Sequence, residues 1–199
     1  MVEQQLRRRG VVDERVLAAM AEIPRERFVP DRYRRRAYFD GAIAIGEGQT
    51  ISQPWIVASM IARLELRGRE RVLDVGTGSG YAAAVLSRCC EEVVSIERRM
   101  GLAARAGALL DELGYPVEVR AGDGTRGAPD CAPFGGILAA ATAEGGPPGP
   151  LLEQLAPGAA LVCPVRRGGE ERLMRFRDGR EEAFASVRFV PLVTGAAEG

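Results

Sequence analysis

Three glycines at alternate positions, set between two apolar runs, constrain this chain more than any other feature. Residues 72–75 have the pattern of a short buried strand, and residues 82–86 have that of a helix. Gly76, Gly78 and Gly80 occupy the turn between them. Glycine permits the positive φ angles of a tight turn and lets a ligand approach the backbone. Strand, glycine turn and helix in this order predict the first unit of a nucleotide-binding βαβ fold.

The spacing of these glycines selects among nucleotide ligands. A dinucleotide fold has G-x-G-x-x-G and holds a pyrophosphate, whereas this turn is G-x-G-x-G and follows Asp74. Asp74 would repel a pyrophosphate, but it could accept a hydrogen bond from an ammonium group. Glu97 ends the next apolar run, at about the 20-residue offset of an acid that binds ribose hydroxyls. These features predict S-adenosylmethionine as the ligand; a glycine-rich loop without a ligand is the alternative.

The chain after the glycine turn alternates between strand and helix patterns. We expect strands at residues 91–96, 117–120, 136–141 and 159–165 and helices at residues 98–113 and 150–155. Asp178 and Gly179 then predict a hairpin between strands at residues 171–176 and 181–190. The predicted fold is one α/β domain with a mostly parallel twisted sheet, helices on both faces and an antiparallel C-terminal hairpin. We divide it into a helical, substrate-side segment at residues 1–66 and a cofactor-binding core at residues 67–199.

Polar residues gather at two places that a ligand could reach. Asp123 follows the strand expected at residues 117–120, at the sheet edge where open α/β folds bind ligands. It could accept a hydrogen bond from an adenine amino group, or it could be an ordinary turn residue. Thr50, Ser52 and Gln53 precede a helix expected at residues 54–66, whose free N–H groups favour an anion such as a carboxylate. A simple capping role for Ser52 is the alternative.

The first 40 residues are rich in arginine. Asp13 is expected to cap a helix at residues 14–23. The basic run at residues 32–36 has two interpretations, an electrostatic patch for an acidic partner or a solvated helix face. The balanced charge of the whole chain favours the solvated face.

Composition excludes several classes of function. The 199 residues carry 27 basic and 27 acidic side chains, so no global field favours nucleic acid. There is no histidine, which excludes a Ser-His-Asp triad and histidine-ligated metals, and the four cysteines match no zinc pattern. We therefore expect no metal. No apolar run is long enough to cross a membrane, and no signal peptide is recognisable at the start. We expect a cytoplasmic monomer with reduced thiols.

Several stretches together resemble one known family over nearly the full length of the chain. The most specific is Gly-Gln-Thr-Ile-Ser-Gln-Pro at residues 48–54, while the glycine turn is shared by all class I methyltransferases. The matching stretches are residues 1–6, 23–30, 45–46, 48–54, 72–81, 122–125, 151–157 and 187–192. On these residues the chain resembles the protein-L-isoaspartate O-methyltransferases, which have a Rossmann-like class I methyltransferase fold.

The resemblance implies methyl transfer from S-adenosylmethionine to the α-carboxylate of L-isoaspartyl residues in damaged proteins. The ester then closes to a succinimide, which hydrolyses partly to normal aspartate, so the reaction repairs protein. Ser52 matches the active-site serine, Glu97 the ribose-binding acid and Asp123 the adenine-side acid. The implied cofactor site comprises Asp74, Gly76, Thr77, Gly78, Gly80, Glu97, Asp123 and Gly124. The implied substrate-binding residues are Glu47, Thr50, Gln53, Val187, Arg188 and Phe189.

The chain departs from the family pattern at a few positions. Glu47 stands where the family usually has histidine, and Gly135 stands where it usually has aspartate. A carboxylate at position 47 beside a carboxylate substrate would repel it by about 1 kcal/mol if solvated. Two alternatives therefore stay open: a related enzyme that methylates another carboxylate in a peptide, or a catalytically weakened homologue that binds the cofactor.

Overall fold

The computed structural model describes residues 1–195, which form one mixed sheet and a separate two-stranded hairpin. Most strands of the sheet begin and end within a few residues of the expected apolar runs. The hairpin consists of β1 (Ile43–Gly46) and β2 (Gln49–Ile51). The sheet consists of β3 (Arg71–Val75), β4 (Glu92–Glu97), β5 (Glu118–Ala121), β6 (Phe134–Ala139), β7 (Ala143–Glu144), β8 (Leu155–Arg167), β9 (Glu170–Arg177) and β10 (Arg180–Ser186).

The strand order places a topological switch beside β3. The order is β10-β9-β8-β6-β3-β4-β5, with β7 paired to β8. Strands β3, β4, β5, β6 and β8 run parallel, and β9 and β10 are antiparallel. The chain moves from β3 outward through β4 to β5 and then returns to β6 on the other side of β3. Open α/β sheets bind ligands in the crevice that such a reversal leaves at the carboxyl ends of the strands.

The helices begin and end at residues with clear local signals. Asp13 caps α1 by accepting hydrogen bonds from the backbone of Arg15 and Val16, and Pro54 opens α2. Gly114, in the left-handed conformation, ends α4. The α-helices are α1 (Glu14–Glu22), α2 (Pro54–Ala62), α3 (Tyr81–Ser87), α4 (Met100–Leu113) and α5 (Gly149–Glu153). A π-helical turn spans Val2–Leu6, and 3₁₀ turns span Arg7–Arg9, Arg25–Phe28, Asp31–Arg36, Gly124–Arg126 and Pro129–Cys131.

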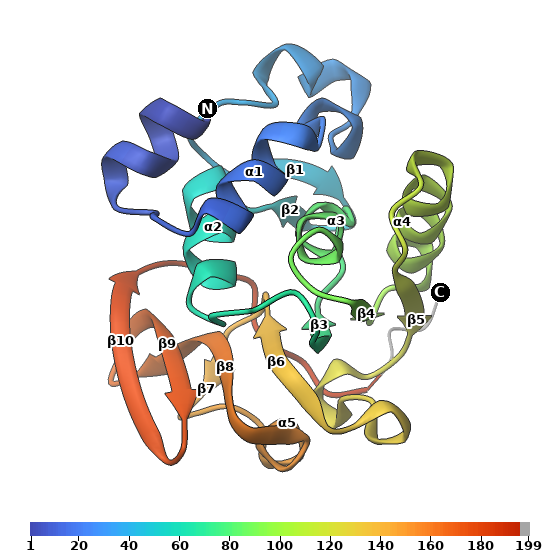
Figure 1. Cartoon of the computed structure of the whole chain (residues 1–199). Coiled ribbons are helices and arrows are strands. Elements are labelled where there is room, and N and C mark those ends of the chain that lie inside the picture. Colours follow the sequence, from blue (N-terminus) through green and yellow to red (C-terminus); the bar gives the residue numbers. More distant parts are fainter. Residues whose placement is uncertain (196–199) are drawn as a thin grey trace.

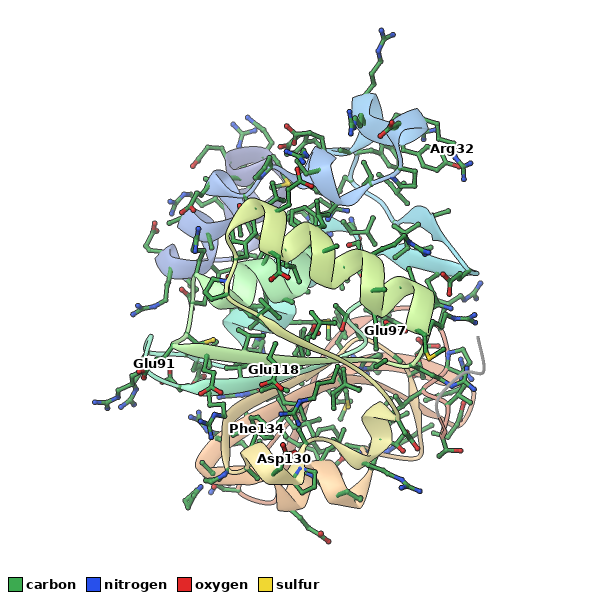
Figure 2. The ribbon with its side chains drawn as sticks, turned by 90° about the vertical axis from the view of Figure 1, so that its right-hand side faces the viewer. Arg32, Glu91, Glu97, Glu118, Asp130 and Phe134 are labelled. Atoms are coloured by element: carbon green, nitrogen blue, oxygen red, sulfur yellow. The ribbon has the colours of Figure 1, made fainter. Side chains whose placement is uncertain are left out.

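The sheet lies between two unequal layers. Helices α1 to α4 cover one face, and the short α5 lies against the other (Figure 1). Figure 2 shows Glu91 and Glu97 at opposite ends of β4, Asp130 on the side of the sheet away from α4, and Arg32 at the far side of the helical layer. The expected α/β architecture, with a mostly parallel sheet and an antiparallel C-terminal hairpin, is confirmed.

The hairpin of β1 and β2 was not anticipated from the sequence, in which residues 41–53 lack periodicity. Its turn holds three consecutive residues at positive φ: Gly46 at 99°, Glu47 at 52° and Gly48 at 70°. Strands of three or four residues are too short to show an alternating pattern, and the glycines hide the turn among loop residues.

The C-terminal strand is shorter than expected. Asp178 and Gly179 form the predicted turn between β9 and β10, both at positive φ. The expectation that the strand continues to residue 190 was wrong, because β10 ends at Ser186. The chain beyond it turns back across the sheet toward β5 (Figure 1). There Thr142 donates to the carbonyl of Val190 and accepts from the N–H of Leu192, bonds that a continued β10 could not make.

The arginine run at residues 32–36 forms an exposed 3₁₀ turn rather than a longer helix. Arg32 projects outward, away from the sheet (Figure 2), and Arg34 pairs with Asp31. Within residues 1–195, no helix is both long enough and apolar enough to cross a membrane.

Candidate active site

A cavity of about 820 Å³ opens at the carboxyl ends of β3, β4 and β6. Three parts of the chain line it: residues 42–57 around the hairpin and the start of α2, the strand ends, and residues 186–193 after β10. The size suits a small organic ligand together with part of a peptide. The topological switch and the cavity therefore coincide.

The glycine turn forms the floor of the cavity with bare backbone. Gly76 and Gly78 both line it, at φ of 98° and 56°. The N–H of Gly76 donates to the carbonyl oxygen of Ile96, and that of Gly78 donates to Oε2 of Glu97 at 2.9 Å. Thr77 also lines the cavity and hydrogen-bonds Ser95. A ligand can therefore lie directly against this turn.

Gly80 has a different surrounding from the other two glycines. It does not line the cavity, and a Cβ on it would lie 3.2 Å from Cδ1 of Leu110 in α4. Its φ of 87° also disfavours a side chain. Gly80 therefore lies where α3 packs against α4, and its predicted role at the cofactor stays a prediction.

Glu97 is the acid that the cavity wall presents. Its side chain is 6% exposed and lies at the end of β4, beneath the first turn of α4 (Figure 2). The N–H groups of Gly78 and Arg99 donate to its two carboxylate oxygens, each at 2.9 Å. Each oxygen keeps a lone pair for a further donor, such as a ribose hydroxyl.

Asp74 lies under the glycine turn and is fully buried. The hydroxyl of Ser95 donates to its Oδ2 at 2.7 Å, while Oδ1 has no hydrogen-bond partner among the described residues. Burial raises the pKa of Asp74 to about 6, the nearby charge of Glu97 acts in the same direction, and the bond from Ser95 opposes both. Asp74 does not line the cavity itself, but a buried carboxylate with a free oxygen fits a ligand that brings an ammonium group.

Asp123 is held by its neighbours and by the C-terminal segment. Its Oδ1 accepts from the backbone N–H and the hydroxyl of Thr125, and its Oδ2 accepts from the N–H of Gly195 at 2.7 Å. Burial raises the pKa of this carboxyl, but these hydrogen bonds outweigh burial and lower it below the usual value. The cavity reaches Gly124 rather than Asp123. An adenine amino group that donates to Oδ2 of Asp123 would therefore share this oxygen with the N–H of Gly195.

Ser52 lines the cavity just before α2. The residue at the N-cap position is Gln53, whose amide reaches Oδ1 of Asp40 at 2.7 Å. The hydroxyl of Ser52 neither caps the helix nor makes any other hydrogen bond among residues 1–195. Of the two interpretations drawn from the sequence, capping is excluded, and Ser52 lies in the cavity wall with a hydroxyl that has no partner among the described residues. Thr50 and Gln53 lie beside it in the same wall.

Two of the positions at which the chain departs from the family pattern lie outside the cavity. Glu47, expected near the substrate, does not line it; its Oε1 accepts from Nη2 of Arg105 at 2.7 Å. Gly135 lies in β6, where a Cβ would be 2.6 Å from Cγ of Glu70, so the larger aspartate would require Glu70 to move. Neither residue puts a charge or a clash at the candidate site.

The segment after β10 closes the cavity from the opposite side. Val187, Arg188 and Phe189 all line it, as expected. Glu171 anchors this segment, because its carbonyl accepts from the N–H of Val187 and its carboxylate accepts from that of Phe189. The segment lines the cavity outside the named strands, and a single parallel bridge joins its Pro191 to Thr142.

Sequence reasoning missed several lining residues. Tyr81 directly follows the glycine turn, and its position alone gave no sign that it lines the cavity. Arg98 and Arg99 follow Glu97 and looked like the exposed start of a helix. The other lining residues without an assigned role are Ala42, Gly48, Gln49, Ile51, Ile56, Val57, Val75, Ser79, Ala82, Ile96, Ala140, Ala141, Ser186 and residues 190–193.

Comparisons with known proteins agree on one family. The family described as protein-L-isoaspartate(D-aspartate) O-methyltransferase (PCMT) matches residues 1–197. A protein-L-isoaspartate O-methyltransferase of Roseiflexus castenholzii is 54% identical over 195 residues, covering 96% of this chain and 89% of the relative. A relative in Marinobacter nauticus, protein-L-isoaspartate O-methyltransferase 2, is 52% identical over 200 residues, covering 97% and 91%.

Solved structures resemble the fold closely. A protein-L-isoaspartate O-methyltransferase superposes with a TM-score of 0.86 at 28% identity, over 100% of this chain and 66% of that one. A Plasmodium falciparum protein of the same description, solved with S-adenosyl-L-homocysteine, gives a TM-score of 0.83 at 22% identity and covers 96% of both chains. The second comparison, at this low identity, shows the shared fold alone.

Proposed function

Because the chain belongs to the protein-L-isoaspartate(D-aspartate) O-methyltransferase family, we propose that the cavity transfers the methyl group of S-adenosyl-L-methionine to the α-carboxylate of L-isoaspartyl residues, with Ser52 at the acceptor. The observation that carries this assignment is the free hydroxyl of Ser52 in the cavity wall, at the start of α2. The hydroxyl can donate to a carboxylate oxygen there. The product ester leads to repair of the damaged residue.

The reaction requires the protein mainly to align the acceptor with the methyl group. An α-carboxylate has a pKa near ~4 and is ionised at neutral pH, so it needs no general base. This agrees with a chain that contains no histidine. The cofactor, when bound, supplies a methyl group activated by a positively charged sulfur. What remains for the chain is to hold the acceptor oxygen in line with that methyl group, which is a proximity effect.

The cofactor fits the floor of the cavity. Gly76 and Gly78 present bare backbone, Glu97 presents carboxylate oxygens for ribose hydroxyls, and Asp74 has a buried oxygen without a partner. We assign Thr77 and Gly124 to the same surface because both line the cavity, and Asp123 to its adenine end through Gly124. This donor set suits an adenosine with an ammonium group and offers no cation at the turn for a pyrophosphate.

The acceptor peptide is assigned to the opposite wall. Thr50, Gln53 and the segment with Val187, Arg188 and Phe189 all line the cavity. The proposed division into a substrate-side segment at residues 1–66 and a cofactor-binding core at residues 67–199 agrees with this lining, except that residues 186–193 also serve the substrate side. Glu47 is left out of the acceptor site, since its carboxylate pairs with Arg105.

We also propose that the enzyme works as a cytoplasmic monomer on proteins, and not on nucleic acid. The formal net charge is zero, so no global field favours nucleic acid. All four cysteines are free. Burial raises the pKa of Cys89, Cys90 and Cys163 to about 12, which keeps these thiols protonated and unreactive.

Replacing Ser52 tests the acceptor assignment. Ser52→Ala removes one hydrogen bond to an anion, worth about 1.5–3 kcal/mol, so kcat/KM for an isoaspartyl peptide is expected to fall about 10- to 100-fold. The dissociation constant of S-adenosyl-L-methionine should not change. Ser87→Ala is the matched control, because the Ser87 hydroxyl bonds the Ala84 carbonyl in α3, outside the cavity. Equal activity of the two variants would show that Ser52 does not bind the acceptor.

A further inference from the structure

Arg25 is a fully buried arginine that has no acidic partner. Its side chain is 0% exposed, in the 3₁₀ turn Arg25–Phe28. Nε donates to the carbonyl oxygen of Ala37 at 2.8 Å, and Nη2 donates to that of Ser52 at 2.7 Å. No carboxylate of residues 1–195 pairs with it, although buried arginines are almost always paired. Its positive charge is therefore uncompensated within the described structure.

The guanidinium lies directly behind the wall that holds Ser52. Its Cζ atom is 4.8 Å from the centre of the Tyr81 ring, and both Ser52 and Tyr81 line the cavity. Nη1 of Arg25 and the hydroxyl of Tyr81 are both buried and lack hydrogen-bond partners in the described part of the chain. The two residues lie against each other, and the interaction with Tyr81 opposes the effect of burial on the pKa of Arg25. A buried tyrosine hydroxyl and a cation without a carboxylate partner thus meet behind the acceptor wall.

This arrangement is costly unless an anion joins it. Burial lowers the pKa of Arg25, the opposing effects of Tyr81 and Tyr38 being smaller, yet a guanidinium remains protonated in proteins. Removing such a charge from water has a large desolvation free energy. Hydrogen bonds to two carbonyl oxygens and contact with an aromatic face offset only part of it. A negative charge on the cavity side of Ser52 would compensate the positive charge of Arg25.

Other cations near the cavity are less suited to this task. Arg98 donates to the carbonyl oxygen of Gly195, Arg99 is partly exposed, and Arg188 is exposed on the segment after β10. Water screens the charge of an exposed side chain, whereas a charge in the dry interior acts at lower effective dielectric constant. Arg25 is the buried cation that contacts the acceptor wall from within.

We propose that Arg25 is a positioning residue for the acceptor carboxylate: it fixes the backbone of Ser52 and supplies the positive potential that favours an anion in front of the Ser52 hydroxyl. The contact joins residues 27 positions apart and ties the N-terminal segment to the start of α2. The proposal rests on the acceptor site described under Proposed function. It adds the selectivity of this site for the ionised α-carboxylate.

The test compares a charged and a neutral ligand. Two β-linked peptides differ only in carrying an α-carboxylate or an α-carboxamide at the isoaspartyl position. Their dissociation constants are measured by calorimetry with S-adenosyl-L-homocysteine present, so that no methyl is transferred. The variants are Arg25→Gln, which keeps a hydrogen-bond donor without the charge, and Arg25→Lys, which keeps the charge without the planar fork.

Arg88→Met is the matched control. Arg88 also stacks on a tyrosine, with Cζ 4.7 Å from the centre of the Tyr115 ring, but it pairs with Glu22 and lies away from the cavity. Melting temperature and the dissociation constant of S-adenosyl-L-homocysteine show whether each variant is folded with an intact cofactor site. A purely structural role of Arg25 would weaken both peptides equally.

We expect the preference for the carboxylate peptide to fall about tenfold in Arg25→Gln, which corresponds to ~1.4 kcal/mol, and to stay within about threefold of the parent in Arg25→Lys and Arg88→Met. An unchanged preference in Arg25→Gln would overturn the proposal. If Arg25→Gln does not fold, loss of the preference in a folded Arg25→Lys would overturn it equally. If the parent enzyme fails to methylate the carboxylate peptide, the acceptor assignment itself is wrong, which is a separate outcome.

Discussion

Oε1 of Glu47 accepts a hydrogen bond of 2.7 Å from Nη2 of Arg105, which joins the turn between β1 and β2 to α4. The pair directs the carboxylate away from the cavity and neutralises it. A second carboxylate beside the acceptor, the concern that the sequence raised, is therefore not part of the wall that holds Ser52. The departure from the family's usual histidine is accommodated by a partner on the neighbouring helix.

Neutralising Glu47 should leave methyl transfer nearly unchanged. Its side chain is 31% exposed and that of Arg105 is 58% exposed, so the pair contributes at most about 1 kcal/mol to stability. We expect kcat/KM of Glu47→Gln for an isoaspartyl peptide to stay within about threefold of the parent. Glu181→Gln, which breaks the distant pair with Arg167, is the control. A gain of about tenfold in Glu47→Gln alone would mean that the carboxylate repels the acceptor.

Gly80→Ala should destabilise the fold without weakening the binding of the cofactor. The left-handed conformation costs about 1–2 kcal/mol for a residue with a Cβ, and contact with Leu110 adds to this. Gly10→Ala is a close control, because Gly10 has the same φ of 87° and no atom within 4 Å of the position that a Cβ would take. Thermal unfolding should show the larger loss for Gly80→Ala. If Gly80→Ala binds the cofactor more weakly but melts at the same temperature as Gly10→Ala, Gly80 acts in cofactor binding and not in packing.

Asp74 should make both stability and cofactor binding depend on pH. Its pKa is raised to about 6 on folding, mainly by burial, so its contribution to stability is complete below its unfolded pKa and is lost as pH rises through about 6. An ammonium ligand favours the ionised form. The dissociation constant of S-adenosyl-L-methionine should therefore fall as pH rises through this range, by at most about tenfold per pH unit, the slope of one linked proton.

Asp74→Asn provides the comparison for that titration. The variant cannot ionise at position 74, so calorimetry across the same range should give a flatter profile, while the neighbouring Glu97 and Ser95 remain in place. Thermal unfolding of the unliganded proteins should show a decline toward neutral pH that is present in the parent and absent in the variant. Identical pH profiles for the two proteins would show that Asp74 does not interact with the ammonium group of the cofactor.

The central βαβ unit could be predicted from the sequence because its signals are local. The apolar run before Gly76 became β3, and the run after Gly80 became α3, each within a few residues. Glu97 ended β4 and reached the cavity as its spacing suggested. Polar residues before Pro54 marked the N-terminus of α2, but the family resemblance, and not this local pattern, singled out Ser52. Periodicity and glycine spacing carry this information without any tertiary contact.

Features that depend on distant contacts could not be predicted. Gly80 matched the glycine pattern, but its role depends on Leu110, which α4 brings against it. Residues 187–190 had a strand pattern, yet β10 ends at Ser186 and the backbone of Thr142 bonds Val190 and Leu192. Arg25 looked like one arginine among many, because its contacts lie at the start of α2 and on α3. In each case the deciding partner is far away in sequence and leaves no local signal.

The most direct test of the account is transfer of labelled methyl from S-adenosyl-L-methionine to two peptides. They are identical except that one carries an L-isoaspartyl residue and the other a normal aspartyl residue. We expect label on the isoaspartyl peptide alone, with the signal strongly reduced in Ser52→Ala and retained in Ser87→Ala. Absence of label from the isoaspartyl peptide while the cofactor binds, or equal label on both peptides, would contradict it.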